Sequence, residues 1–256
     1  MESRQSTKIP ILTYHSIDAS KSVVSTAPET FRRQMRFLRE NNYRVVSLEK
    51  LVAKLDSKEH LPPKSLALTF DDGFQNFYTT AFPVLAEYEF PATVFLVTNY
   101  CGKHNDWAGN PLGLPRSRLL SWPEIKELNS YRIEFGAHTE THPDLTRIPL
   151  LQAEQEITRS KTMIENQLGR AIATFAYPYG RFNRTVRQII AAKFGSACST
   201  NLGKAHISSD VFALERIDSY YLSNLAVFNC LATKTFDSYL RFRQTLRSFK
   251  TYFQAH

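Results

Sequence analysis

The sequence predicts an α/β protein in which parallel strands close into a barrel. Short apolar runs rich in β-branched and aromatic residues alternate with longer segments of helical periodicity, as in chains that form parallel sheets. About seven such strand-helix units follow one another, and this number favours a barrel. Polar side chains that can carry chemistry come directly after several of the strands, at the end where barrel active sites are built.

The strands are expected where short runs of apolar, β-branched and aromatic residues occur. In chain order these runs are 8–14, 43–47, 65–70, 92–98, 133–137, 172–177 and 195–199. Helical periodicity lies between them, at 28–42, 74–90, 148–169 and 183–195, and the last two segments end at glycines placed as C-caps, Gly169 and Gly195. Residues 100–117, with their Pro and Gly residues and Trp107, predict a long functional loop.

Composition indicates a globular protein in a reducing compartment. The 256 residues, 43% of them hydrophobic, are enough to bury one large α/β domain or two small ones. Cys101, Cys198 and Cys230 are an odd number at wide spacings, so free thiols are expected. The N-terminal residues lack the apolar run of a signal peptide, and no stretch has the length of a membrane span. A cytoplasmic location is therefore the expectation.

The net charge of +8 invites a nucleic-acid partner, but the basic residues are too scattered along the chain for one. They concentrate only at 240–256, where Arg241, Arg243, Arg247 and Lys250 interleave with apolar residues. This pattern predicts an amphipathic helix that packs on the domain; the alternative is a weak contact with a membrane surface or another protomer. The sequence predicts no oligomeric state.

The run Thr69-Phe70-Asp71-Asp72-Gly73 places two carboxylates side by side after a predicted strand. Gly73 allows the backbone to turn sharply there. Taken alone, the run is equally typical of a turn followed by a helix N-cap, because Asp-Gly favours turns and Asp caps helices.

A second motif, His138-Thr139-Glu140-Thr141-His142, has two imidazoles separated by three residues, a spacing that lets both reach one metal ion. Pro143 disfavours helical geometry at His142, so the motif differs from the zinc-protease helix. Two unrelated surface histidines are the alternative for this pair by itself. Together with an Asp, the pair would form a two-His, one-carboxylate site with open positions for water and substrate.

The motifs TFDDG, HTETH and YPYG occur in the order and near the spacing of the polysaccharide deacetylase family, carbohydrate esterase family 4. Flanking segments such as LALTFDDGFQNFYTTAFPVLAEYEFPATVFLV extend this resemblance over about residues 8 to 218. It implies a distorted (β/α)7-type barrel as a catalytic domain over residues 1–222, with 223–256 as a C-terminal helical extension packed on the same domain.

The resemblance implies that Asp72, His138 and His142 hold a divalent metal, commonly zinc, with cobalt or nickel as alternatives. Asp71 would then be the general base in the removal of acetyl groups from N-acetylated amino sugars of a glycan substrate. The motif Pro178-Tyr179-Gly180 would supply an oxyanion donor through the backbone N–H of Tyr179.

The chain departs from the commonest family pattern at two places. The Leu-x-His motif that usually supplies the acid is replaced by Leu214-Glu215-Arg216, and the third motif lacks its initial arginine. Both departures resemble the exopolysaccharide and biofilm-type branch, where an N-terminal Tyr-His motif carries the acid. His15 in Tyr14-His15 is therefore the candidate acid, with a structural histidine as the alternative and His206 as the fallback.

Arg216 resembles a replacement for the missing arginine near Asp71, although an ordinary ion-pair role is equally open. Trp107, flanked by Asn105, Asp106 and Gly109, is the candidate for an exposed platform that stacks on a sugar ring. Two other functions stay open. The same metal site could hydrolyse other amide or formamide C–N bonds, or the chain could be a non-catalytic carbohydrate-binding relative, against which Asp71 argues.

Overall fold

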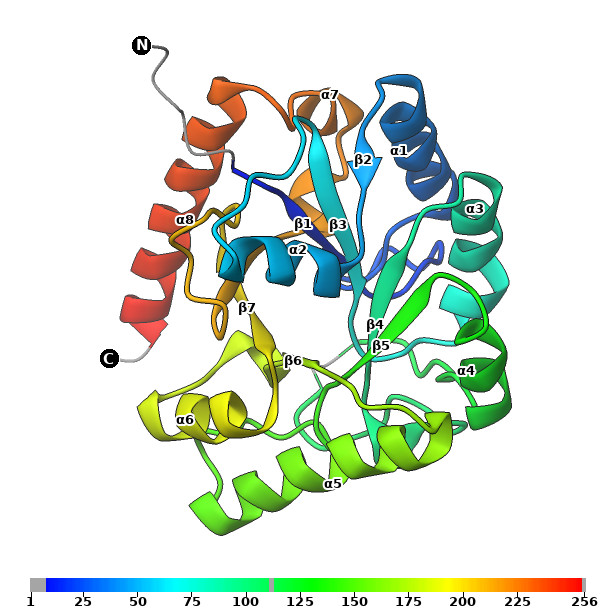
Figure 1. Ribbon diagram of the computed structural model, residues 1–256, viewed down its shortest axis with the longest axis vertical. Coiled ribbons are helices and arrows are strands. Elements are labelled where there is room, and N and C mark those ends of the chain that lie inside the picture. The colour runs from blue at the N-terminus through cyan, green and yellow to red at the C-terminus, as the bar shows by residue number, and fades with distance from the viewer. Residues whose placement is uncertain (1–7, 111–112, 255–256) are drawn as a thin grey trace.

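A closed ring of parallel strands forms the centre of the protein in the computed structural model, which describes residues 8–110 and 113–254. Within those residues seven strands form the ring, and β1 closes it by pairing with both β3 and β8 (Figure 1). The predicted barrel is confirmed. Its strands are β1 (Ile11–Tyr14), β3 (Ser65–Phe70), β4 (Ala92–Leu96), β5 (Ile133–Ala137), β6 (Thr174–Ala176), β7 (Ser196–Leu202) and β8 (Leu214–Asp218).

The seven strands of the ring differ from the seven that the sequence predicts. The run at 43–47 forms only a two-residue strand, β2 (Arg44–Val45), which pairs with the start of β3 outside the ring. The seventh strand of the ring is instead β8. The sequence did not predict β8, because Glu215 and Arg216 interrupt its apolar pattern. The register between β7 and β8 shifts between Cys198 and Leu202, which distorts the barrel locally.

Most of the helices lie around the outside of the ring (Figure 1). Their buried apolar side chains pack against the strands. In α1, for example, Phe31, Met35 and Leu38 are buried. The helices are α1 (Pro28–Glu40), α2 (Leu48–Asp56), α3 (Phe82–Glu87), α4 (Trp122–Leu128), α5 (Leu150–Leu168), α6 (Arg184–Lys193), α7 (Leu225–Phe228) and α8 (Lys234–Gln254), with a π-helical turn η1 (Phe77–Ala81) and 3-10 turns η2 (Thr98–Tyr100), η3 (Pro178–Gly180) and η4 (Ser219–Leu222).

The two predicted glycine caps have different outcomes. Gly169 ends α5 with a left-handed backbone at φ 67°, as predicted, and its N–H binds the carbonyl of Glu165. The prediction for Gly195 is wrong: α6 ends at Lys193 and its C-cap is the extended residue Phe194. The start of α6 follows the usual rule, because the Asn183 side chain accepts a hydrogen bond of 2.9 Å from Val186 N.

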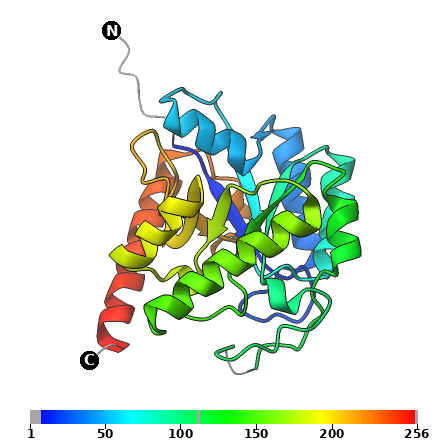
Figure 2. The same ribbon diagram turned by 60° about the horizontal axis from the view of Figure 1, so that its bottom comes forward.

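Two layers of apolar side chains form the core. Side chains that point outward from the strands, such as Leu68 and Phe135, pack against the helices. Inward-pointing side chains such as Ile11 and Phe95 fill the barrel and contact Leu51 of α2. In Figure 2, α2 lies at the top and residues 100–110 and 113–117 of the long loop lie at the bottom, so these segments mark opposite ends of the barrel.

The C-terminal helix α8 lies along one side of the barrel (Figure 1). Phe236 and Leu240 are buried, and the Gln244 side chain accepts a hydrogen bond of 3.1 Å from Leu202 N at the end of β7. The side chains of Arg247 and Lys250 lie outside the described part. The boundary at residue 222 stays a prediction, as does a membrane contact. Among the described residues, none of the helices combines the length and the apolar character that crossing a bilayer demands.

Candidate metal and catalytic site

The carboxyl ends of the strands bring the predicted site residues together. Asp71 and Asp72 follow β3, His138 follows β5 and His15 follows β1. All of these except His15 are buried, with exposed fractions of 7% or less. Segments far apart in the sequence therefore meet at the end of the barrel where the strand-helix loops converge, which is where active sites of parallel barrels are built.

Asp72, His138 and His142 form a group that could hold a metal ion. The Asp72 Oδ1 atom lies 3.5 Å from His138 Nε2 and 3.4 Å from His142 Nε2, and the ligand atoms of all three lie within 4.8 Å of one another. His138 is oriented by its other ring nitrogen, which is 2.7 Å from the carbonyl oxygen of Ala176. Two imidazoles and a carboxylate around one point are a donor set that suits a divalent transition metal.

Burial and neighbouring charges set the protonation of these three groups. Burial lowers the pKa of His142 to about 3, so this imidazole is neutral and offers a lone pair. Burial alone would lower the pKa of His138, but its hydrogen bond with Asp72 and the nearby carboxylates raise it overall. Burial alone would raise the pKa of Asp72, but the hydrogen bond with His138 and the histidine charges lower it. A metal ligand must be the neutral imidazole, so metal binding and protonation compete at His138.

The backbone at Asp72 and Gly73 turns so that the two neighbouring carboxylates separate. Asp72 has φ 70° and Gly73 has φ 71°, which is the left-handed region. A Cβ at Gly73 would lie 3.0 Å from Leu96 Cδ2, so this position favours glycine for both its conformation and its space. Asp71 in turn donates its N–H to the Tyr14 carbonyl at 2.9 Å. The turn thus directs Asp72 to the histidines and leaves Asp71 outside the metal-ligand group.

Arg216, from β8, lies beside Asp71 and binds it with both arms of its guanidinium. The distances are 2.8 Å from Nη1 to Oδ1 and 2.7 Å from Nη2 to Oδ2. The remaining Nε donates to the Ser199 carbonyl at 2.9 Å. Burial alone would raise the pKa of Asp71, but the charge and hydrogen bonds of Arg216 lower it below its usual range. Asp71 is therefore held as a carboxylate.

Replacing Arg216 by Gln is expected to move the acidic limb of activity to higher pH, because burial then dominates the pKa of Asp71. In the wild type the lowered pKa of Asp71 contributes stability that is present above its unfolded pKa and lost as the pH falls through the folded value. Breaking the buried pair should cost about 3–5 kcal/mol at pH 7. The cost should be smaller at pH 4, because burial raises the pKa of Asp71 in the variant and its carboxyl can then be protonated. Profiles of kcat/KM and of unfolding against pH measure both effects, and an unchanged acidic limb would contradict the role of Arg216.

His15, which follows β1, also lies near Asp71. Its Nε2 is 3.9 Å from Asp71 Oδ2, and its side chain is 18% exposed, so it can meet a ligand that enters from solvent. His206, the fallback acid, is in a pocket with Lys8 and Glu215 near the start of β1. Because His15 follows the end of the same strand, the two histidines are at opposite ends of the barrel.

Trp107 is not the exposed platform that the sequence predicts. Only 3% of it is exposed, and its ring lies 5.3 Å from that of Tyr100 and 4.8 Å from that of His142, between centroids. The loop folds back on itself because the Asn105 side chain accepts a hydrogen bond of 2.7 Å from Ser117 N. This closure buries Trp107 behind His142, where it supports the imidazole instead of facing a sugar.

Tyr179 is at the carboxyl end of β6, in η3, with a left-handed backbone at φ 57°. Its ring centroid lies 4.7 Å from that of His142, so the Pro178-Tyr179-Gly180 turn borders the metal-ligand group as the sequence suggests. A Cβ at Gly180 would lie 2.5 Å from the backbone nitrogen of Thr200, which requires glycine there. The turn is therefore fixed closely against β7.

Two residues support the site although the sequence predicted no role for them. Thr69 inside the barrel accepts a hydrogen bond of 3.2 Å from Arg216 Nη1 and donates one of 3.0 Å to the Leu12 carbonyl. Glu156 of α5 is 5% exposed and binds the loop between the two histidines. The signal for Glu156 was a carboxylate on the apolar stripe of a predicted helix, between Ala153 and Ile157.

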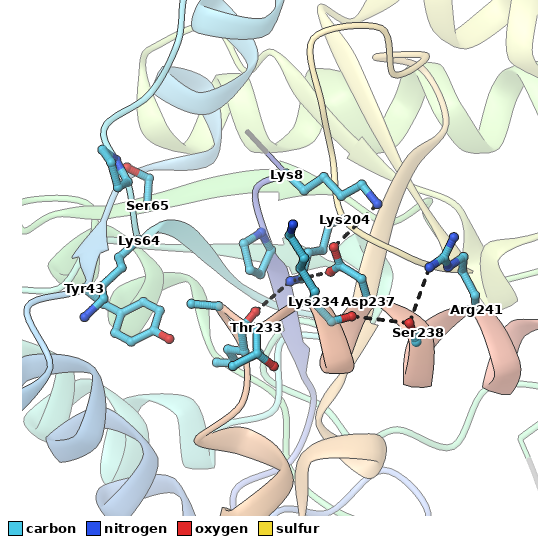
Figure 3. Close-up of a pocket in the computed structure, with 14 residues that line it drawn as sticks. Lys8, Tyr43, Lys64, Ser65, Lys204, Thr233, Lys234, Asp237, Ser238 and Arg241 are labelled. Atoms are coloured by element: carbon cyan, nitrogen blue, oxygen red, sulfur yellow. Dashed lines mark hydrogen bonds and ion pairs between the residues drawn. The ribbon is translucent and has the colours of Figure 1, made fainter. Parts of the chain in front are cut away.

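A cavity of about 820 Å³ lies at the other end of the barrel and takes no part in this site (Figure 3). Lys8 and Ser65, at the starts of β1 and β3, line it together with residues of α8. Its Asp237 pairs with Lys8 at 3.5 Å and with Lys204 at 2.7 Å. Asp72, His138 and His142 do not line this cavity. Its size therefore does not make it a candidate for the active site.

Comparison with known proteins places the chain in a family. The model of the polysaccharide deacetylase family matches residues 58–196, which is more than half of the chain. The putative polysaccharide deacetylase YxkH of Bacillus subtilis is 28% identical over 212 residues, which span 82% of this chain and 71% of that protein. The poly-β-1,6-N-acetyl-D-glucosamine N-deacetylase of Escherichia coli strain K12 is 30% identical over 135 residues, which are 50% of this chain and 20% of that protein.

A solved structure agrees with this placement. The Streptococcus pyogenes deacetylase PplD in complex with acetate superimposes with a TM-score of 0.74 at 29% identity, covering 84% of this chain and 93% of that one. The range that matches the family model includes the two aspartates, the two histidines and Tyr179, whereas His15 and Arg216 lie outside it. The chain therefore belongs to the polysaccharide deacetylase family.

Proposed function

We propose that the protein is a divalent-metal-dependent de-N-acetylase in which Asp72, His138 and His142 bind the metal and Asp71 acts as the general base. The observation that carries this proposal is the pair of neighbouring aspartates with different partners. Asp72 faces two imidazoles, whereas Asp71 is held ionised by Arg216 and stays outside the ligand group. An ionised carboxylate beside the metal ligands can act as a base, which favours an enzyme over a protein that only binds carbohydrate.

The donor set of two nitrogens and one oxygen favours zinc, with cobalt and nickel as the alternatives to test. When bound, such a cation supplies Lewis-acid chemistry, which polarises the acetamide carbonyl and makes water a stronger acid. The orientation of His142 supports a ligand role: its Nε2 lies 3.4 Å from Asp72 Oδ1, so this is the ring nitrogen that faces the other proposed ligands.

The residues of the chain then divide the hydrolysis between them. Asp71 takes a proton from the attacking water as a C–O bond forms at the acetamide carbon. The backbone N–H of Tyr179 donates to the oxygen on which negative charge develops. His15 gives a proton to the leaving nitrogen as the C–N bond breaks, so the products are acetate and a free amine.

For the substrate we propose an N-acetylated amino sugar within a polysaccharide. The name of the E. coli relative makes β-1,6-linked N-acetylglucosamine the first polymer to test. The experiment strips the protein of metal, restores zinc, cobalt or nickel in turn, and measures acetate and free amine released from β-1,6- and β-1,4-linked oligomers. Equal amounts of the two products, dependent on metal, are expected. Release of formate from formylated amides without any acetate would favour a different C–N hydrolase.

Replacing His15 by Ala is expected to lower kcat by about 10²- to 10⁴-fold, because the leaving amine loses its proton donor. Zinc content and melting temperature should stay near those of the wild type, since His15 is neither a proposed ligand nor fully buried. His206→Ala is the matched control and should be fully active, because His206 lies at the other end of the barrel. A fall in the His206 variant with none in the His15 variant would reverse the assignment.

A further inference from the structure

The loop between His138 and His142 is held by a single side chain of α5. The Glu156 Oε2 atom accepts hydrogen bonds from Glu140 N at 2.9 Å and from Thr141 N at 2.8 Å. Its Oε1 atom accepts a third, of 2.6 Å, from the Thr141 hydroxyl. The two residues in the middle of the loop therefore direct both of their backbone donors to the same carboxylate.

Three other backbone groups of the loop are bound elsewhere. Thr139 O accepts from Thr98 N at 3.2 Å, and Glu140 O accepts from Asn99 N at 3.0 Å, so η2 holds the carbonyl side. His142 N donates to the Thr139 hydroxyl at 2.9 Å, inside the loop itself. The loop is thus held from two sides: backbone N–H groups of η2 bind its carbonyl oxygens, and the Glu156 carboxylate binds its N–H groups.

The loop needs such a grip because its backbone is strained. Thr139 has φ 69° and His142 has φ 62°, both in the left-handed region. That region is unusual for any residue other than glycine and is an outlier for a β-branched one, at a cost of about 1–3 kcal/mol each. Without partners that hold it, this backbone would relax to an ordinary conformation, and the imidazole of His142 would turn away from Asp72.

Glu156 occupies a position that packing alone would give to an apolar residue. It is 5% exposed on the buried stripe of α5, near Ala153 and Ile157. Burying a carboxylate is costly unless hydrogen bonds replace its hydration, and here three hydrogen bonds from the histidine loop do so. In the nearby pair of Arg159 with Glu140, at 3.7 Å, the guanidinium is largely exposed, so the pair contributes little.

We propose that Glu156 is a positioning residue for the metal site: it fixes the backbone of the 138–142 loop in the strained conformation that turns both imidazoles toward Asp72, and so sets the affinity for the metal. The inference rests on the proposed function, because it assigns the supporting carboxylate of the same site. Groups that orient metal ligands in this way typically change affinity by about 10- to 100-fold.

The test compares zinc affinity, by chelator competition, among four variants and the wild type. Glu156→Ala should weaken binding by about 10- to 100-fold. Glu156→Gln should stay near the wild type, because its amide oxygen can accept from both N–H groups and its NH₂ can donate to the Thr141 hydroxyl. Glu154→Ala, on the exposed side of the same helix, and Ile157→Val, which removes a buried methyl group, control for charge and for general destabilisation, and both should bind zinc normally.

A second readout works without metal. In the metal-free protein, hydrogen exchange at the amides of Glu140 and Thr141 should be fast in Glu156→Ala and slow in the wild type and in Ile157→Val. A wild type that binds no zinc would overturn the proposed function, while the exchange rates would still judge the role of Glu156. The positioning role is wrong if Glu156→Ala binds zinc as the wild type does, if Ile157→Val weakens zinc binding equally, or if the two amides stay protected.

Discussion

Replacing Asp71 by Asn is expected to lower kcat by about 10²- to 10⁴-fold while one zinc ion per chain remains bound. Asn keeps the shape of the side chain but cannot take a proton from water, whereas the proposed ligands, Asp72 and the two histidines, are untouched. Acetate release under saturating substrate gives kcat, and elemental analysis of the same sample gives the metal content.

The Asp71 variant also leaves the buried guanidinium of Arg216 beside a neutral partner, which could destabilise the protein by about 3–5 kcal/mol. A melting curve of the same sample therefore has to show a folded protein at the assay temperature. A folded, zinc-loaded Asp71→Asn protein with the turnover of the wild type would remove Asp71 from the mechanism. A folded protein that has lost its zinc would instead make Asp71 a ligand.

Replacing His138 by Ala is expected to abolish zinc binding and, with it, measurable acetate release. The imidazole is buried, its Nε2 lies 3.5 Å from Asp72, and the variant leaves only two of the three proposed ligands. The measurement is zinc content after dialysis against a weak chelator. His60→Ala, which changes an exposed histidine, is the matched control and should keep one zinc per chain.

Stoichiometric zinc in the His138 variant would show that the metal is held elsewhere. Loss of zinc in the His60 control as well would point to a trivial effect of the substitution or of the purification. Comparison of the two variants therefore distinguishes the loss of a metal ligand from a general loss of zinc during preparation.

The positions of the metal-ligand candidates could be predicted from the sequence because they depend on a local rule. Asp71, Asp72 and His138 each come within two residues of the end of a buried strand. Once the strands are recognised as parallel members of one barrel, their carboxyl ends must meet. Because only three residues separate His142 from His138, the second imidazole also lies close to Asp72. The order of the three motifs also indicated the polysaccharide deacetylase family, and the match to the family model confirms this prediction.

The predictions that were wrong concerned features that depend on contacts between distant parts of the chain. The strand β8 was not predicted because Glu215 and Arg216 are residues typical of a solvent-facing segment. Only the fold shows that Arg216 points into the barrel, where it pairs with Asp71 at the end of β3. Trp107 lies in a polar loop, which favoured exposure, but the fold of that loop around Asn105 buries it against His142. No local signal distinguishes a tryptophan on a loop surface from one that the loop covers.

The central claim is that one divalent cation is bound by Asp72, His138 and His142 with Asp71 left free of it. The most direct measurement is a crystal structure of the zinc-loaded protein with anomalous data collected at the zinc edge. We predict a single strong peak about 2.0–2.2 Å from the Nε2 atoms of both histidines and from one Asp72 oxygen, with the Asp71 carboxylate still paired with Arg216. A peak at any other place, or one that includes Asp71 among its ligands, would contradict the account.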